Sequence, residues 1–184
     1  MPQSRSAQPV SLSLDAIYDE HFNFVWRSLH RLGVPPDGVD DALQEVFLAV
    51  HRRLADFEHR STLRTWLFGI ALRVARDHAR KRQKHGALRE LDPEIEDESA
   101  ASPLENAARS EARDLLYSLL AELEEDKRAA FILADIEGMS VPEIATGLGV
   151  NVNTLTSRLR VARREFEAAL ARHRARSAFR GSKP

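Results

Sequence analysis

The stretch SVPEIATGLGVNVNTLTSRL, residues 140–159, decides how the C-terminal half of this chain folds. Ser140 is suited to cap a helix over 141–148, because its hydroxyl oxygen can accept a backbone N–H from the first turn. Gly149 then allows a sharp turn that a bulkier residue would resist. A second helix begins near Asn153. Two short helices joined by so tight a turn predict a helix-turn-helix.

The second helix of this pair has an apolar side and a polar side. At about 100° per residue, Leu155, Leu159 and Phe166 share one side, and the opposite side carries polar or basic residues. Such a helix can enter the major groove of DNA, with its first residues near base edges and its arginines on phosphates or guanine. A helical hairpin with a solvated outer face is the alternative. The residues expected on DNA are Asn153, Thr154, Thr156, Ser157, Arg158, Arg160 and Arg164.

The helical period continues upstream of this motif. Leucines recur over 115–123, and a second apolar pattern over 129–136 ends at Gly138. Both patterns have the spacing of amphipathic helices that pack against a core. We therefore expect a C-terminal helical domain over 111–171.

Three apolar stripes nearer the N-terminus predict a second helical domain, over 14–84. Trp66 shares the stripe of the third helix with Leu67, so we expect it in the core. For Phe68 the sequence leaves two alternatives, a position in the core or a position where the ring stacks on a nucleic-acid base. Strand alternation is absent from the sequence, which predicts an all-α fold. The expected helices cover about 14–32, 40–57 and 62–84.

Charge is segregated along the chain, although the net charge of the 184 residues is only −1. Residues 73–89 hold seven basic side chains against one acid, and residues 154–184 hold nine against two. Residues 90–126 between them hold thirteen acids against two arginines. The pattern suggests two polyanion-facing domains and an acidic linker over 85–110, with ordinary solvated helix faces as the alternative.

Several classes of protein are excluded by what the sequence lacks. It has no cysteine, so it has neither a disulfide framework nor a thiol nucleophile. The seven histidines show no HExxH spacing, and a Gly-rich phosphate loop and a GxSxG motif are absent. No apolar run approaches the roughly 20 residues of a membrane span, and Met1 to Leu14 does not have the form of a secretory signal. We expect a non-enzymatic cytoplasmic protein without metal or cofactor.

Four sequence blocks follow one another along the chain: DALQEVF (41–47), TWLFGIA (65–71) with RDH (76–78), EGMSVPEIA (137–145) and NTLTSRL (153–159). In this order and separation they resemble bacterial RNA polymerase sigma factors of the extracytoplasmic-function (ECF) group of the sigma-70 family. The resemblance implies a sigma-2 domain over 14–84 and a sigma-4 domain over 111–171, joined by the flexible acidic linker. Residues 1–13 and the basic tail 172–184 match nothing diagnostic, and we expect both to be flexible.

The resemblance implies a subunit that directs core RNA polymerase to promoters. Sigma-2 would dock on the β′ clamp helices through Asp41, Gln44 and Glu45, and sigma-4 would meet the β flap and read the minus-thirty-five element. An anti-sigma factor is the expected regulatory partner. A flipped minus-ten base would be captured by the loop before the third helix and by the start of that helix. The residues implied for the minus-ten element are Arg60, Ser61, Thr62, Arg73, Arg76 and Arg80.

Two departures from the family pattern leave the promoter sequence open. The family often has asparagine where Arg73 stands, and lysine or arginine where Thr156 stands.

A stand-alone helix-turn-helix regulator of transcription is the alternative function, and it would bind duplex DNA specifically without polymerase. A third alternative is a pure interaction module that only titrates an anti-sigma factor. Such a module would need no basic DNA-facing surface, so the basic residues argue against it. An extended linker over 85–107 would reach roughly 75 Å, enough for promoter elements about 55 Å apart.

Overall fold

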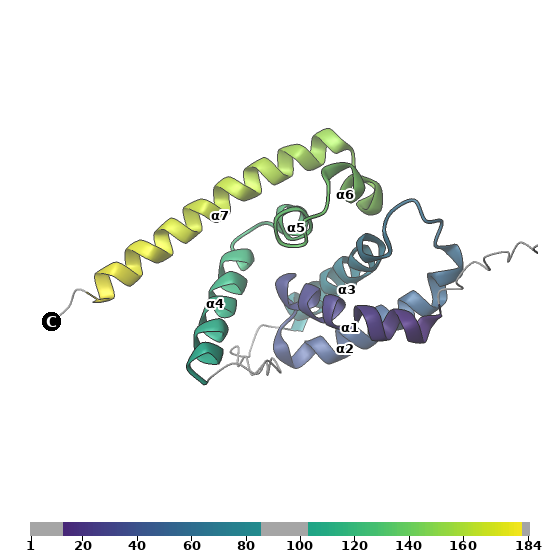
Figure 1. The fold of residues 1–184 in the computed structure, drawn as a ribbon, viewed down its shortest axis with the longest axis horizontal. Helices are drawn as coiled ribbons and strands as arrows, with labels where there is room; N and C mark the ends of the chain where they lie inside the picture. Colours follow the sequence, from purple (N-terminus) through teal and green to yellow (C-terminus); the bar gives the residue numbers. More distant parts are fainter. Residues whose placement is uncertain (1–12, 86–102, 182–184) are drawn as a thin grey trace, which may run out of the picture.

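The computed structural model describes residues 13–85 and 103–181, and every regular element within these ranges is a helix or a helical turn. The all-α prediction is confirmed. Figure 1 shows α1, α2 and α3 gathered in one bundle, with α5 between that bundle and α7. The N-terminal elements are α1 (Leu14–Arg31), α2 (Pro36–Arg53), the 3₁₀ turn η1 (Leu54–Asp56) and α3 (Leu63–His85). The C-terminal elements are α4 (Pro103–Ala121), α5 (Glu125–Phe131), the π-helical turn η2 (Ile132–Ile136), α6 (Val141–Leu148) and α7 (Val152–Gly181).

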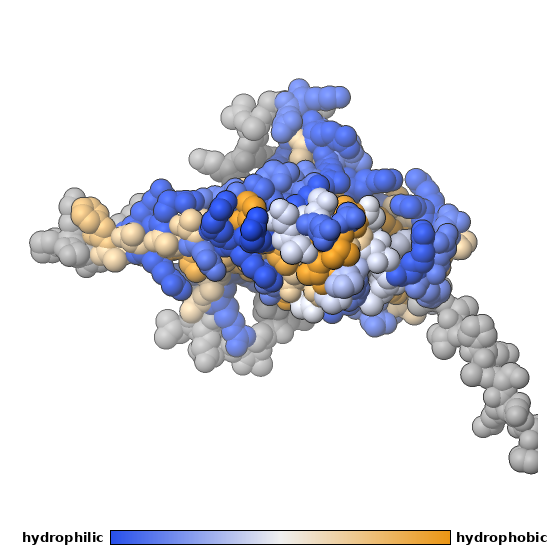
Figure 2. Space-filling model, turned by 90° about the horizontal axis from the view of Figure 1, so that it is seen from above, coloured by the Kyte–Doolittle hydropathy of each residue, from blue (hydrophilic) through white to orange (hydrophobic). Residues whose placement is uncertain are grey.

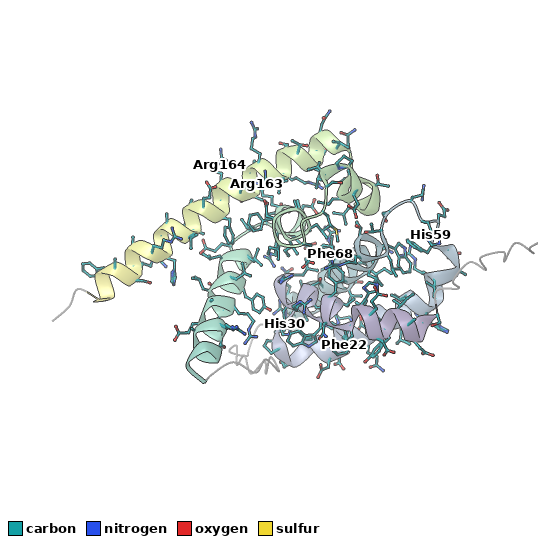
Figure 3. The ribbon with its side chains drawn as sticks, viewed as in Figure 1. Phe22, His30, His59, Phe68, Arg163 and Arg164 are labelled. Atoms are coloured by element: carbon teal, nitrogen blue, oxygen red, sulfur yellow. The ribbon has the colours of Figure 1, made fainter. Side chains whose placement is uncertain are left out.

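Local sequence explains where the N-terminal helices begin. The hydroxyl of Ser13 caps α1 by accepting the N–H of Ala16 at 3.1 Å. Helix α2 starts at Pro36, four residues before the predicted start, because proline is already shaped for the first helical position. Phe68 is fully buried in the bundle (Figure 3), so its position in the core is now assigned. Trp66 is partly buried and packs against the same core.

The helix-turn-helix forms as the sequence predicts. Ser140 caps α6 by accepting the N–H of Glu143, and Gly149 ends the helix with a left-handed φ of 67°. Leu155 and Leu159 of α7 are buried, and Phe166 stacks on Phe131 of α5 with ring centroids 4.6 Å apart. The apolar side of α7 therefore faces the interior of its own domain.

Two predicted flexible regions are partly helical. Helix α7 does not end near residue 171 but continues to Gly181, because alanines and arginines favour a helix and no glycine or proline interrupts them. Figure 1 shows this end of α7 leading away from the other helices. Helix α4 begins at Pro103, inside the stretch expected to be linker. The predictions for residues 1–12, 86–102 and 182–184 lie outside the described residues.

The two domains share one buried cluster. Helix α3 packs against α6, and α1 packs against α4. Buried side chains of both halves, including Leu67 and Ile144, belong to the same apolar core. The sequence predicts two linked domains, but it does not predict that they pack against each other. Among the described residues, no helix has both the length and the apolar character to cross a membrane.

Candidate nucleic-acid and polymerase interfaces

The outer side of α7 is open to solvent at nearly every residue that the sequence places on DNA. Figure 2 looks onto the α6–α7 side, where hydrophilic side chains surround a small apolar area. Figure 3 shows Arg164 on the side of α7 away from α5. Asn151 caps the helix, because its side-chain oxygen accepts the N–H of Asn153 at 2.8 Å. The exposed residues of the predicted set are Asn153, Thr154, Thr156, Ser157, Arg160 and Arg164.

Arg158 differs from the rest of that set. Its guanidinium lies 2.5 Å from a carboxylate oxygen of Asp126 on α5, and its side chain is only 32% exposed. Its neighbour Arg163 donates to Asp135 at 2.9 to 3.1 Å, and these hydrogen bonds raise the pKa of Arg163. Both arginines therefore pack α7 against its own domain. Of the arginines that the sequence predicts on DNA, only Arg160 and Arg164 are therefore exposed on the outer side of α7.

The loop between η1 and α3 carries three residues predicted for the minus-ten element. Thr62 donates to a carboxylate oxygen of Glu143 on α6 at 2.8 Å, and Arg60 pairs with Glu58 at 2.8 Å. Ser61 is partly buried at the same place. The loop therefore lies against α6 of the helix-turn-helix instead of standing free.

An aromatic cluster in this loop was missed by the sequence analysis. His59 has a left-handed φ of 53°, which places its ring 4.4 Å from that of Phe57. Phe57 in turn lies 5.1 Å from Trp66, and Figure 3 shows His59 at the end of the bundle. The only signal in the sequence was a pair of rings two residues apart in a polar loop. Flat rings at a loop tip provide faces on which bases stack.

The predicted arginines of α3 have different surroundings. Arg76 donates to Glu125 and, at 2.6 Å, to Asp126, both on α5. Burial opposes the charge of Arg76, but its hydrogen bonds to the two carboxylates and their charges raise its pKa. Arg80 pairs with Asp77 on the same helix and stays largely exposed. Arg76 is thus paired with the C-terminal domain through α5, and Arg80 is paired only within α3.

Arg73 lines a cavity of about 370 Å³ between α3 and the helix-turn-helix. Arg53 and Trp66 line it from the N-terminal bundle, and Gly147 and Arg158 line it from the helix-turn-helix. Neither Arg53 nor Arg73 has an ion-pair partner among the described residues. The cavity therefore joins two unpaired positive charges and an aromatic ring at the domain boundary.

The predicted polymerase-docking residues lie together on α2. Asp41 and Gln44 are exposed, while Glu45 accepts from Lys81 at 3.3 Å and lies 3.4 Å from His78. An apolar groove of about 460 Å³ runs beside them, and its rim includes the exposed side chain of Leu48. Leu48 was missed, although it is the apolar residue of α2 that falls outside the buried stripe.

Within the described residues, no cluster of histidine and acidic side chains has the grouping that a metal ion needs. The outer side of α7 and the region around the loop before α3 are built from arginines, hydroxyls, amides and aromatic rings. Such groups bind phosphates, base edges and base faces, and a catalytic constellation is not evident among them.

Two family descriptions match this chain, each over one of its domains. Sigma-70 region 2 matches residues 17–85, and Sigma-70, region 4 matches residues 113–166. Sigma factor NccH of Alcaligenes xylosoxydans xylosoxydans is 32% identical over 170 residues, 90% of this chain and 91% of the relative. ECF sigma factor SigM of Mycobacterium tuberculosis is 30% identical over 150 residues, 79% of this chain and 73% of the relative.

A solved structure has the same fold. CnrH, a sigma factor known from Cupriavidus metallidurans, was solved in complex with the cytosolic domain of CnrY. It is 29% identical to this chain, covers 86% of it over 87% of its own length, and superposes with a TM-score of 0.64.

Proposed function

Because the chain belongs to the RNA polymerase sigma factors of the ECF type, we propose that α2 docks it on core RNA polymerase while α7 and the loop before α3 read promoter DNA. The observation that carries this proposal is the open, polar outer side of α7 above a fully formed helix-turn-helix. The chain then acts in the cytoplasm as a dissociable subunit and not as a catalyst. The stand-alone regulator is not favoured, since both sigma regions are present.

Docking on polymerase is proposed to combine charge with apolar contact. Asp41 and Gln44 offer exposed polar groups, and Leu48 beside them is 48% exposed. Protein interfaces generally have an apolar centre surrounded by polar groups. Leu48 and the groove beside it would supply that centre, and the carboxylates would set the orientation on the basic surface of a partner.

Promoter reading is proposed to divide between the two domains. The exposed arginines and amides of α7 would contact base edges and phosphates of the minus-thirty-five element. The aromatic cluster of Phe57, His59 and Trp66 would offer stacking faces to a base extruded at the minus-ten element. CnrH binds the cytosolic domain of CnrY, and we propose an anti-sigma partner of that kind for this chain.

Transcription with purified core polymerase tests the proposal. Added protein is expected to produce initiation at specific start sites, and Ser157→Ala with Arg160→Ala to reduce it while leaving the complex with core polymerase intact. A lost base contact corresponds to about 1–3 kcal/mol, or roughly fivefold to 150-fold in affinity. Asp41→Arg is expected to lower core binding instead. Glu167→Gln, an exposed change outside the predicted DNA contacts, is the matched control.

Failure of the protein to bind core polymerase would contradict the proposal. Specific duplex binding by the free protein at full strength would instead support the stand-alone regulator. Loss of core binding in the α7 variant would mean that the two surfaces have been assigned to the wrong partners.

A further inference from the structure

The cavity of about 370 Å³ between α3 and the helix-turn-helix holds more positive charge than its own lining neutralises. Four arginines and one aspartate line it. The aspartate, Asp126, is shared by Arg76 and Arg158, at 2.6 and 2.5 Å. Arg53, the last residue of α2, and Arg73 of α3 have no ion-pair partner within residues 13–85 and 103–181. Two uncompensated guanidinium groups are therefore left at the cavity.

The acids closest to these two arginines are already engaged. A second groove, between α2 and α3, is also lined by Arg53 and Arg73, and it contains the carboxylates of Glu45 and Asp77. Each of these carboxylates is paired with a basic side chain of α3. Because nearby acids do not neutralise Arg53 and Arg73, an anion that enters the cavity gains their full attraction. The free charges favour a negatively charged ligand.

The rest of the lining suits a flat, apolar group. Trp66 lies on the cavity wall, partly buried. Ligand sites usually combine apolar and aromatic walls with a few polar groups that fix orientation. A ring held against Trp66 would lie on the same wall as the two free arginines. The apolar residues that complete the lining are Ile70, Leu72, Leu148, Val150 and Leu155.

From this lining we infer that the cavity binds a small phosphorylated ligand of the nucleoside phosphate class. Its phosphates would lie on Arg53 and Arg73, because a guanidinium matches phosphate oxygens with two parallel hydrogen bonds. Its base would lie against Trp66 and the apolar wall. The volume falls in the range of small-molecule sites, about 300–1,000 Å³. Protein lies on two sides, from the bundle and from the helix-turn-helix, so one small molecule fits this space better than a continuous strand. Such a site is additional to the promoter and polymerase surfaces.

Titration of the full chain with GTP is the direct test. The protein has two tryptophans, so the Trp26→Phe background leaves Trp66 as the only one. GTP is expected to quench its fluorescence in a saturable way. Pyrophosphate, which has the charge but no ring, should bind by calorimetry without quenching. Guanosine, which has the ring but no phosphate, should bind at least tenfold more weakly than GTP.

Three substitutions locate the bound ligand. Arg53→Gln and Arg73→Gln should each weaken GTP binding about tenfold, the loss expected for a hydrogen bond to a charged group. Both arginines are exposed and unpaired, so the fold should be unaffected. Trp66→Leu should lower the affinity for GTP to that for pyrophosphate. Arg52→Gln is the matched control, because Arg52 is exposed on the same turn of α2 but lines only the groove between α2 and α3.

Several results would overturn the inference. One is the absence of saturable binding by both GTP and pyrophosphate at roughly millimolar concentration. Another is an equal loss in Arg52→Gln, which would indicate general attraction of anions, and a third is full binding in both cavity variants. Single-stranded minus-ten DNA that requires Arg53 and Arg73 while GTP does not bind would assign the two arginines to DNA. The titrations contain neither polymerase nor promoter, so their result is independent of the transcription assay.

Discussion

The two proposed DNA surfaces are made of similar residues but differ in access. On α7, Arg160 and Arg164 face solvent because the helix rests on its own domain through Leu155 and Leu159. Thr62, just before α3, and Arg76, in the second half of α3, already hold partners on the sigma-4 domain. The difference shows that the chemistry of a surface does not decide whether it is available. Availability depends on what else packs there.

The largest expected effect removes the minus-ten surface altogether. Phe68→Ala should destabilise the sigma-2 bundle by about 3–5 kcal/mol, because the ring is fully buried and its loss leaves a cavity. Urea unfolding measures the change. Leu48→Ala, an exposed apolar position on α2, is the control, and its stability should stay within about 0.5 kcal/mol. An equal loss in both variants would mean that Leu48 is buried in solution.

A second substitution should separate the surfaces without unfolding either. Gly147→Ala should weaken the packing of α6 against α3 by about 1–3 kcal/mol through overpacking against Thr65. Alanine also favours helix α6 by up to about 1 kcal/mol relative to glycine, so the sigma-4 domain itself should not be destabilised. Hydrogen exchange at residues 62–66 should rise. Adding Thr65→Ser removes the colliding methyl group and should reverse part of the effect, and no reversal would exclude the steric explanation.

Acid should loosen a different part of the boundary. The ring of His30 lies 4.3 Å from that of Trp26 and 5.9 Å from that of Tyr117, where α1 meets α4. Burial lowers the pKa of His30 from 6.5 to about 4; the charge of Arg113 lowers it further, and Asp40 opposes the shift. The Nε2 atom has no hydrogen-bond partner among the described residues. The packed state therefore requires the neutral ring.

Because the pKa of His30 is lower when packed, its stabilising contribution is complete above pH 6.5 and is lost as the pH falls toward 4. The free energy of unfolding measured in urea should fall between pH 6.5 and 5, above the range in which most carboxylates take up protons. His30→Phe keeps a ring between its neighbours and should abolish the pH dependence. A dependence that persists in this variant would assign the titration to another group.

The smallest expected effect lies on the exposed part of α7. Arg172 pairs with Glu122, in the turn after α4, at 2.5 Å, but both side chains are more than half exposed. Ion pairs in such positions contribute little, so Arg172→Ala should change stability by less than about 1 kcal/mol. Thermal unfolding at low and high salt measures it. A larger loss would show that this end of α7 supports the packing of α7 against α4.

Much of the site was predictable because its signals are local. Ser140 begins α6 by capping it with its side chain, and Gly149 ends α6 with a left-handed backbone. The side of α7 that carries Arg160 follows from the helical period alone. The inward turn of Arg158 was not predictable, since its partner Asp126 lies on another helix. Nor was the cluster of Phe57 and His59, which depends on one left-handed backbone angle.

The sequence by itself determined the all-α fold, the position of the recognition helix and the family, because periodicity, capping residues and ordered motifs act over a few neighbouring residues. Only the tertiary structure decided that Glu137 meets Arg31, 106 residues away along the chain, and that Gly147 lies against Thr65. Such pairs have no period or spacing to reveal them. They exist because two independently patterned surfaces have complementary shape and charge, and that is a property of the folded molecule.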